Sequence, residues 1–79
     1  MINDYTESNI FILKIINNKI HVYYYDDIDN FSDKKITILN NSTNYIIKGN
    51  NLIIEKMDEE ELIINGNITT IEMAYNNEK

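Results

Sequence analysis

The chain has no cysteine, proline or tryptophan, and only two glycines and one histidine among its 79 residues. Without cysteine it can form neither a disulfide framework nor a cysteine-based zinc site. Its single histidine, His21, stands in no recognisable relation to a serine that could act as a nucleophile, so the set of groups needed for covalent catalysis is missing. No glycine-rich phosphate loop is present. These absences predict a protein that is not an enzyme and that uses no cofactor or metal ion.

Long apolar runs and clustered basic residues are missing too. No stretch approaches the roughly 18 apolar residues of a membrane-spanning helix, and the polar, acidic start of the chain is unlike a signal peptide. We therefore expect a cytoplasmic protein without direct membrane insertion, which reaches a membrane only through another protein. The net charge is −6 and the seven basic residues are scattered, which argues against nucleic acid as a partner.

A chain of 79 residues allows one domain at most. We expect that domain to span residues 1–79, with an ordered core of about 9–75 between frayed tails, 1–8 and 76–79. A chain of this length buries only about 60–65% of its unfolded surface, so the core is thin. Small domains without disulfides or metals often gain stability by oligomerising or docking. The acidic surface keeps an isoleucine-rich chain in solution.

The sequence does contain a repeat. The segment Tyr45-Ile-Ile-Lys-Gly-Asn-Asn-Leu-Ile-Ile-Glu-Lys-Met57 returns as Leu62-Ile-Ile-Asn-Gly-Asn-Ile-Thr-Thr-Ile-Glu-Met-Ala74, and the two glycines give an offset of 66 − 49 = 17 residues. We interpret each copy as a β-branched strand, a turn and a second strand. The turns are placed at Gly49-Asn50 and Gly66-Asn67, because glycine adopts positive φ at no steric cost.

Short β-branched segments separated by polar turns predict seven strands. They are expected at residues 10–16, 19–24, 35–39, 45–48, 52–56, 61–65 and 68–75. The first two form a hairpin around Asn17-Asn18, since asparagine tolerates the positive φ of a two-residue turn. Residues 26–33 are interpreted as an acidic loop, with Ile28 and Phe31 as its only anchors to the core.

The predicted fold class is therefore all-β, an antiparallel meander rolled into a small sandwich or open barrel. The alternative is a short β-solenoid, because an offset of 17 residues also fits one coil of a solenoid. In the last strand Ile71, Met73 and Tyr75 share one face but Ile68 does not. A bulge near Thr69-Thr70 would return Ile68 to the core face, and we predict one there.

Two acidic segments and the histidine are candidate sites that the sequence does not support. The spacing from Asp27 fails the calcium-loop pattern, because Phe31 stands at its fifth position and no glycine follows. The run Asp58-Glu-Glu-Glu61 suits docking of a basic partner but is unspecific. His21 lies on an alternating strand and is interpreted as an ordinary outward residue.

Alternation in the repeat predicts which side chains face the core. The core side is expected to hold Tyr45, Ile47, Leu52, Ile54, Leu62 and Ile64. Ile46, Ile53 and Ile63 then point to the opposite face, where a one-sided sheet places polar residues. Two interpretations stay open: the second face is covered, by the other wall of a sandwich or by the N-terminal hairpin, or it is a surface for self-association or a protein partner.

The repeat also carries a family resemblance, together with shorter matches upstream. The matching segments are Ile20-His-Val22, the Ile28…Phe31-Ser32 pair, Ile36-Thr-Ile38, Tyr45 to Ile54, Glu61 to Ile71, and Tyr75 as the closing aromatic. In this order they resemble the YabP/YqfC family of small sporulation proteins from endospore-forming bacteria, over about residues 10–75. The chain departs from the family at Thr43-Asn44 and at the Asp26-Asp27 turn, where members commonly have a glycine.

The resemblance implies a non-enzymatic protein made in the mother cell and needed for spore formation, in a family whose members are associated with coat or cortex development. It also implies a partner, because YqfC-type members are typically encoded beside a YqfD-type membrane protein. Such a partner would hold the protein at the forespore surface. The second hypothesis, of a different class, is a generic structural β-module that self-associates into an oligomer and has no link to sporulation.

Overall fold

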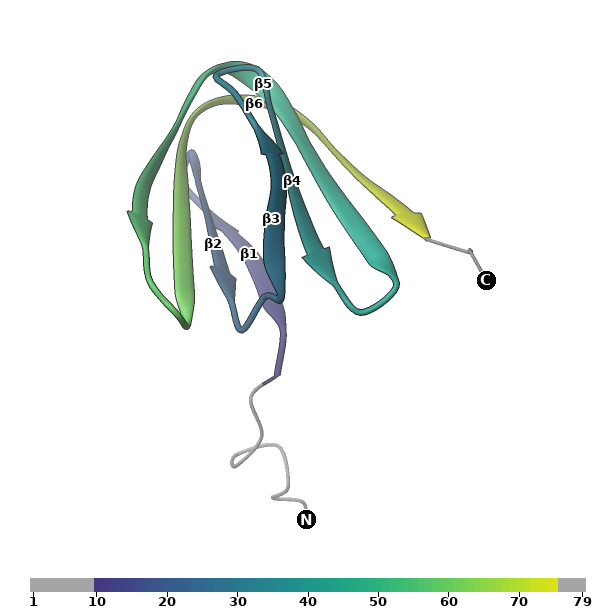
Figure 1. Cartoon of the computed structure of the whole chain (residues 1–79). Coiled ribbons are helices and arrows are strands. Elements are labelled where there is room, and N and C mark those ends of the chain that lie inside the picture. Colours follow the sequence, from purple (N-terminus) through teal and green to yellow (C-terminus); the bar gives the residue numbers. More distant parts are fainter. Residues whose placement is uncertain (1–9, 76–79) are drawn as a thin grey trace.

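The computed structural model describes residues 10–75 and shows six strands in one open sheet, with no helix in that range. The strands are β1 (Ile12–Ile16), β2 (Lys19–Tyr23), β3 (Asp27–Phe31), β4 (Lys35–Asn40), β5 (Thr43–Met57) and β6 (Glu61–Tyr75). Their order across the sheet is β1-β2-β6-β5-β4-β3 (Figure 1). The all-β prediction is confirmed, and the predicted tails lie outside the described residues. Every neighbouring pair is antiparallel, which excludes the solenoid, whose coils stack in parallel.

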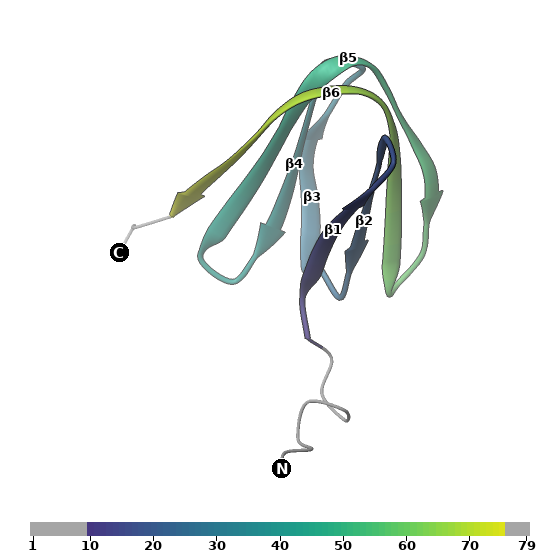
Figure 2. The ribbon, with the colours of Figure 1, turned by 180° about the vertical axis from the view of Figure 1, so that it is seen from behind.

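The repeat folds differently from the prediction. It forms two continuous strands of 15 residues, β5 and β6, rather than four short ones. Gly49-Asn50 and Gly66-Asn67 do not reverse the chain. They lie inside these strands, where Gly49 pairs with Ile68 and Asn50 with Asn67. Both strands bend there, at the apex of an arch (Figures 1 and 2).

The turn assignment was wrong because glycine serves a bend as well as a turn. A Cβ at Gly49 would collide with the backbone carbonyl of Asn67, and one at Gly66 would meet the carbonyl oxygen of Asn51 at 2.6 Å. Gly66 also has a φ of 135°, which side-chain-bearing residues rarely adopt. The two glycines therefore let the backbones of β5 and β6 approach closely while both strands change direction.

Bulges accompany the bend. Lys48 pairs with Thr70 and Gly49 with Ile68, so Thr69 is an extra residue on β6. The predicted bulge near Thr69-Thr70 is thus confirmed, and Ile68 does pack against the core. Two further register shifts, between residues 50 and 53 and between 54 and 56, place extra residues on β5. Bulges increase local twist and bending, and here they fold one sheet over itself.

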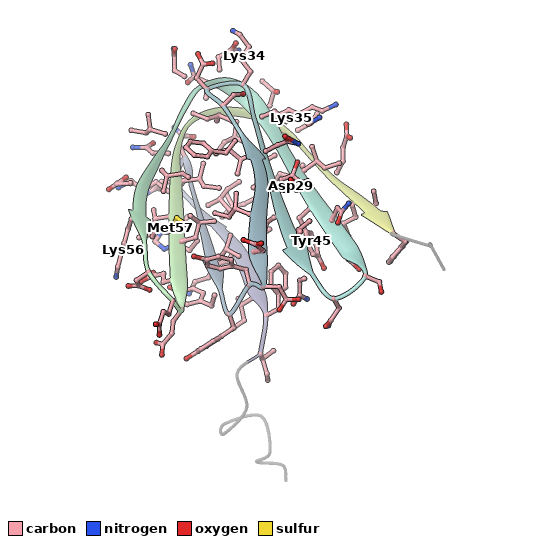
Figure 3. All side chains as sticks on the ribbon, in the orientation of Figure 1. Asp29, Lys34, Lys35, Tyr45, Lys56 and Met57 are labelled. Atoms are coloured by element: carbon pink, nitrogen blue, oxygen red, sulfur yellow. The ribbon has the colours of Figure 1, made fainter. Side chains whose placement is uncertain are left out.

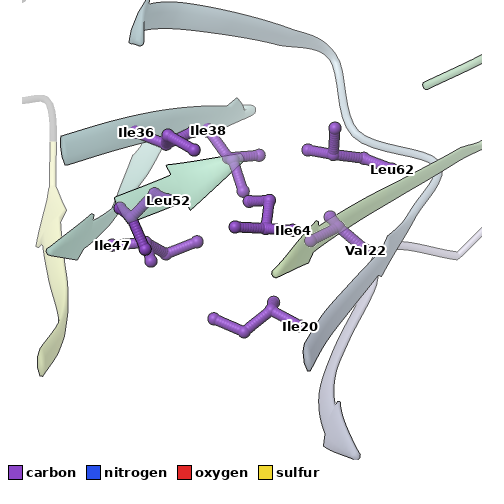
Figure 4. Close-up of a cluster of buried hydrophobic side chains, with 8 residues drawn as sticks. All are labelled: Ile20, Val22, Ile36, Ile38, Ile47, Leu52, Leu62 and Ile64. Carbon is purple, nitrogen blue, oxygen red and sulfur yellow. The ribbon is translucent and has the colours of Figure 1, made fainter. Parts of the chain in front are cut away.

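The bend divides the sheet into two halves that face each other. The first half consists of β1, β2, the start of β6 and the end of β5; the second consists of β3, β4, the start of β5 and the end of β6. Side chains fill the space between them (Figure 3). The buried cluster draws on both halves (Figure 4): Ile20, Val22, Ile36, Ile38, Ile47, Leu52, Leu62 and Ile64. Fully burying such a side chain contributes about 1.5–3 kcal/mol.

The predicted core face of the repeat is confirmed. Four of its six residues belong to the buried cluster, and the other two, Tyr45 and Ile54, are partly buried against it. The ring of Phe11, just before β1, stacks on that of Tyr45 in the opposite half, with 4.8 Å between centroids. The N-terminal hairpin is confirmed as well, with Asn17 at a φ of 58° in its turn.

The prediction of a loop at residues 26–33 was wrong, because β3 occupies most of it as an edge strand. Ile28 pairs with Ile38 and packs against the core. The acidic residues beside it face outward, as charges on edge strands commonly do. Phe31 is not an anchor: it is 63% exposed, since a bulge at Asn30 interrupts the alternation after Asp29.

Candidate interaction surfaces

The bend creates sheet edges that a flat meander would not have. The start of β6, residues 61–65, lies between β2 and β5, whereas residues 68–75 pair only with β5. Within the described residues no strand pairs with the other edge of residues 68–75. In Figures 1 and 2 this end of β6 runs away from the arch with only β5 beside it. An unpaired edge presents backbone N–H and C=O groups that can template another strand.

An apolar strip accompanies this edge, and we call it the β6 rim. It consists of Ile15, Ile68, Ile71, Met73 and Tyr75. Ile15, Ile68 and Ile71 line one groove together with the β1–β2 turn, with a volume of about 290 Å³. Met73 and Tyr75 continue on the face of Ile71 and are 55% and 71% exposed. The rim carries no charge, and exposed apolar strips of this kind mark interaction sites.

The sequence alone predicts part of the β6 rim. It showed that Ile71, Met73 and Tyr75 share one face, but alternation alone does not tell whether another layer covers that face. Among the described residues, the half of the sheet that faces this segment ends before it reaches Met73 and Tyr75. β1 reaches only the groove at Ile15, and the described strands place nothing over Met73 and Tyr75.

The three residues predicted as a partner surface do not lie together. Ile53 and Ile63 share the outer face of the first half, where both neighbour Asn65. Ile46 lies on the outer face of the second half, between Thr37 and Glu72. Only Ile53 is largely exposed, at 55%. These residues share a parity along their strands, but alternation alone does not show that the bend separates them.

Ion pairs occupy the outer face around Ile63. Lys56 Nζ lies 2.8 Å from Glu61 Oε1, and Lys19 Nζ lies 3.0 Å from Glu55 Oε2. The hydrogen bond from Lys56 lowers the pKa of the Glu61 carboxyl, and the same bond raises the pKa of Lys56. The Lys19–Glu55 pair is 40% exposed on both sides, and a pair this exposed contributes little to stability. Glu61 is more shielded, at 19% exposure.

His21 belongs to the same outer face. Its Nδ1 atom lies 3.6 Å from Glu61 Oε2, and this atom is buried without a hydrogen-bond partner. The side chain is largely shielded, so the prediction of an ordinary outward residue holds for its direction but not for its exposure. Within residues 10–75 no three His, Asp or Glu side chains converge as metal ligands do.

A second groove lies at the end of the arch opposite the apex, and we call it the base groove. The structure brings together the two acidic segments here: Tyr25 Oη donates to the carbonyl of Asp58 at 2.8 Å, and Tyr24 N to that of Glu60 at 2.8 Å. The groove has a volume of about 550 Å³ and is lined by Tyr25, Asp26, Asp27, Met57, Asp58 and Glu59. Hydrogen bonds from the backbone N–H groups of Glu61 and Glu60 lower the pKa of Asp58.

The fold and its surfaces define a small all-β protein built as one bent sheet with open strand edges. Residues 5–79 match the YabP family, and the chain belongs to that family, as its strand pattern predicted. Membership indicates a sporulation-related protein. No curated protein and no solved structure matches the chain. Residues 10–75 contain no helix that is long and apolar enough to cross a membrane.

Proposed function

We propose that this YabP-family protein has no catalytic activity and acts in spore formation by binding another protein along the end of β6. The observation that carries the proposal is the β6 rim: an unpaired strand edge, residues 68–75, joined to an uncharged apolar face. An extended segment added to a free edge gains backbone hydrogen bonds from the edge and specificity from pockets for alternate side chains. Here the groove at Ile15, Ile68 and Ile71 provides such a pocket.

The two faces of this segment suit such a partner differently. The outer face holds Thr70 and Glu72, and Glu72 pairs with Lys48 at 3.3 Å. The inner face is apolar. A strand that alternates apolar and polar residues would bury the first set against Ile71 and Met73 and keep the second in water. The proposed occupant is therefore an amphipathic β-strand of another protein.

The resemblance to the family supports a proposed partner and a proposed place of action. A YqfD-type membrane protein is the proposed partner, and it would hold this protein on the mother-cell side of the forespore surface during coat or cortex development. Because the chain is acidic overall, with a net charge of −6, it is suited to reach the membrane through a protein rather than through anionic lipid.

Co-purification tests this proposal. The tagged protein is co-expressed with the YqfD-type membrane protein of the same genome, and we expect the membrane protein to be retained. Met73→Lys places a charge on the rim and should reduce retention about tenfold or more, since burying an unpaired charge is costly. Ile53→Lys, an equally exposed isoleucine on the outer face, is the matched control and should retain the partner. Equal retention by both variants would contradict the role of the rim.

A deletion strain tests the biological role separately. Loss of the gene should reduce the yield of heat-resistant spores, and the Met73→Lys allele should fail to restore it while the Ile53→Lys allele restores it. Normal heat-resistant spores in the deletion strain would contradict a function in spore formation.

The second candidate is a structural module that self-associates and has no sporulation partner, favoured by the same open edge, since two β6 ends can pair with each other. The solution mass separates the two candidates. In this alternative Met73→Lys lowers the oligomeric mass of the isolated protein, whereas the partner proposal predicts that this substitution leaves that mass unchanged.

A further inference from the structure

The tip of the β3–β4 hairpin, residues 31–35, is basic where the base groove is acidic. Phe31 is 63% exposed there, the largest exposure of any described aromatic residue except Tyr75. Lys34 and Lys35 follow it, exposed and without an ion pair among the described residues. Asp33 is the only acid at the tip, so the tip combines an aromatic ring with a net positive charge.

The tip is held in shape by its own hydrogen bonds. Ser32 Oγ accepts from the backbone N–H groups of Lys34 and Lys35, both at 3.2 Å. The bend of β5 supports it from below, where Gly49 N donates to the carbonyl of Lys34 at 3.0 Å and Leu52 N to that of Asp33 at 2.8 Å. A preorganised projection loses little conformational entropy when it binds.

The base groove is complementary to this tip. Tyr25 and the exposed Met57 provide an apolar surface in it, surrounded by the carboxylates of its lining. Among the ion pairs of the described residues, one involves an acid of the groove: Lys56 lies 3.9 Å from Asp58 but 2.8 Å from Glu61, outside the groove. The acids of the groove therefore keep a net negative charge that Lys56 does not neutralise.

The two surfaces lie at opposite ends of the molecule. Asp27 begins β3 beside the groove and Phe31 ends it at the tip, and a strand of this length spans about 13 Å. Figure 3 shows Lys34 at the top of the arch and Met57 farther down. A molecule cannot place its own tip in its own groove, so any such contact joins two copies.

We propose that the base groove receives the β3–β4 tip of a second copy. Phe31 would pack on Tyr25 and Met57, and the two lysines of the tip would pair with the carboxylates of the groove. Because the joined surfaces differ, each added copy still offers one free tip and one free groove, and the assembly is an open chain. It does not depend on the proposed function, since it leaves the β6 rim free.

Charge reversal tests the proposal. The tip variant is Lys34→Glu with Lys35→Glu, and the groove variant is Asp27→Lys with Glu59→Lys. All four side chains are exposed, and Asp58 is left intact because it caps the β5–β6 turn.

Sedimentation of the wild type at rising concentration and low salt should give an average mass that exceeds twice the 9.3 kDa of the monomer. Raising the ionic strength to about 0.5 M should lower it.

Each variant alone should stay at the monomer mass. The tip variant brings like charges together at every joint, and the groove variant removes the net negative charge of the groove, because its two new lysines balance Asp26 and Asp58. An equimolar mixture should regain mass toward that of the wild type, since the unchanged tip of one variant meets the unchanged groove of the other, and the reversed tip can pair with the two new lysines of the changed groove. Lys14→Glu, a reversal on β1 away from both surfaces, is the control and should behave as the wild type. Circular dichroism confirms that the variants are folded.

A wild type that is monomeric at every concentration would overturn the proposal, as would a folded variant that keeps the wild-type mass or a mixture that stays monomeric. Retention of the membrane protein is measured separately, through the rim variants. Failure of the assembly therefore does not imply failure of the proposed function.

Discussion

Both ends of β6 carry apolar side chains on the inner face of the sheet, but their environments differ. At the start, Leu62 and Ile64 are fully buried, whereas at the end Met73 and Tyr75 are 55% and 71% exposed. Both ends pair with β5, so pairing with β5 does not cause the difference. The start also pairs with β2 and faces the opposite half of the sheet, while within residues 10–75 the end has neither a second neighbouring strand nor a full cover. Whether an apolar side chain on this strand is buried or exposed therefore depends on whether another part of the sheet packs over it. The strand that carries the side chain does not determine its burial.

Truncation at the two ends should give the largest contrast. Ile64→Ala removes a fully buried side chain and should lower the free energy of unfolding by about 2–5 kcal/mol. Met73→Ala should lower it by less than about 1 kcal/mol, since the side chain is already exposed. Urea unfolding of both variants measures the difference. Similar losses at the two positions would show that the end of β6 is covered in solution.

A substitution between the two ends should have a smaller effect. Gly66→Ala adds a Cβ at a φ of 135° and against the backbone of Asn51, and should cost about 1–3 kcal/mol. Thr70→Ala, on the same strand beyond the bend, is the control and should change stability by less than about 0.5 kcal/mol. If Gly66→Ala were neutral in urea unfolding, the close approach of β5 and β6 at the bend would be refuted.

Acid should weaken the fold modestly, through groups near the start of β6. The pKa values of Asp58 and Glu61 are lowered in the folded state, by backbone hydrogen bonds and by Lys56 respectively. A lowered folded-state pKa stabilises above the unfolded value, and that stabilisation is lost as pH falls through the folded value. Stability should therefore decline below about pH 4. Asp58→Asn should reduce the decline, and an unchanged pH profile in this variant would contradict a role for Asp58.

The alternation of apolar and polar residues predicts the local structure of this protein, but it does not predict the bend of the sheet. The N-terminal hairpin, the core face of the repeat and the bulge at Thr69 all follow from side chains within one or two strands. Gly49 and Gly66 were assigned to turns because a glycine beside an asparagine suits either a turn or a bent strand. Only the pairing of β5 with β6 along their whole length decides between them.

The candidate surfaces depend on that same long-range pairing. The sequence of β3 resembles a loop because its charges obscure a single inward residue, Ile28. Ile46, Ile53 and Ile63 share a parity in sequence, but the bend puts Ile46 on a different half. The base groove unites two acidic runs that lie more than thirty residues apart, as the bond from Tyr25 to Asp58 shows. No local pattern contains these juxtapositions.

Amide hydrogen exchange along β6 tests the central claim most directly. In the isolated protein, residues 61–65 should exchange slowly and residues 68–75 much faster, because only the first segment is paired on both sides and buried. In the complex with the membrane protein, residues 68–75 should become protected while residues 61–65 stay unchanged. A complex that forms while residues 68–75 keep their fast exchange would contradict the account.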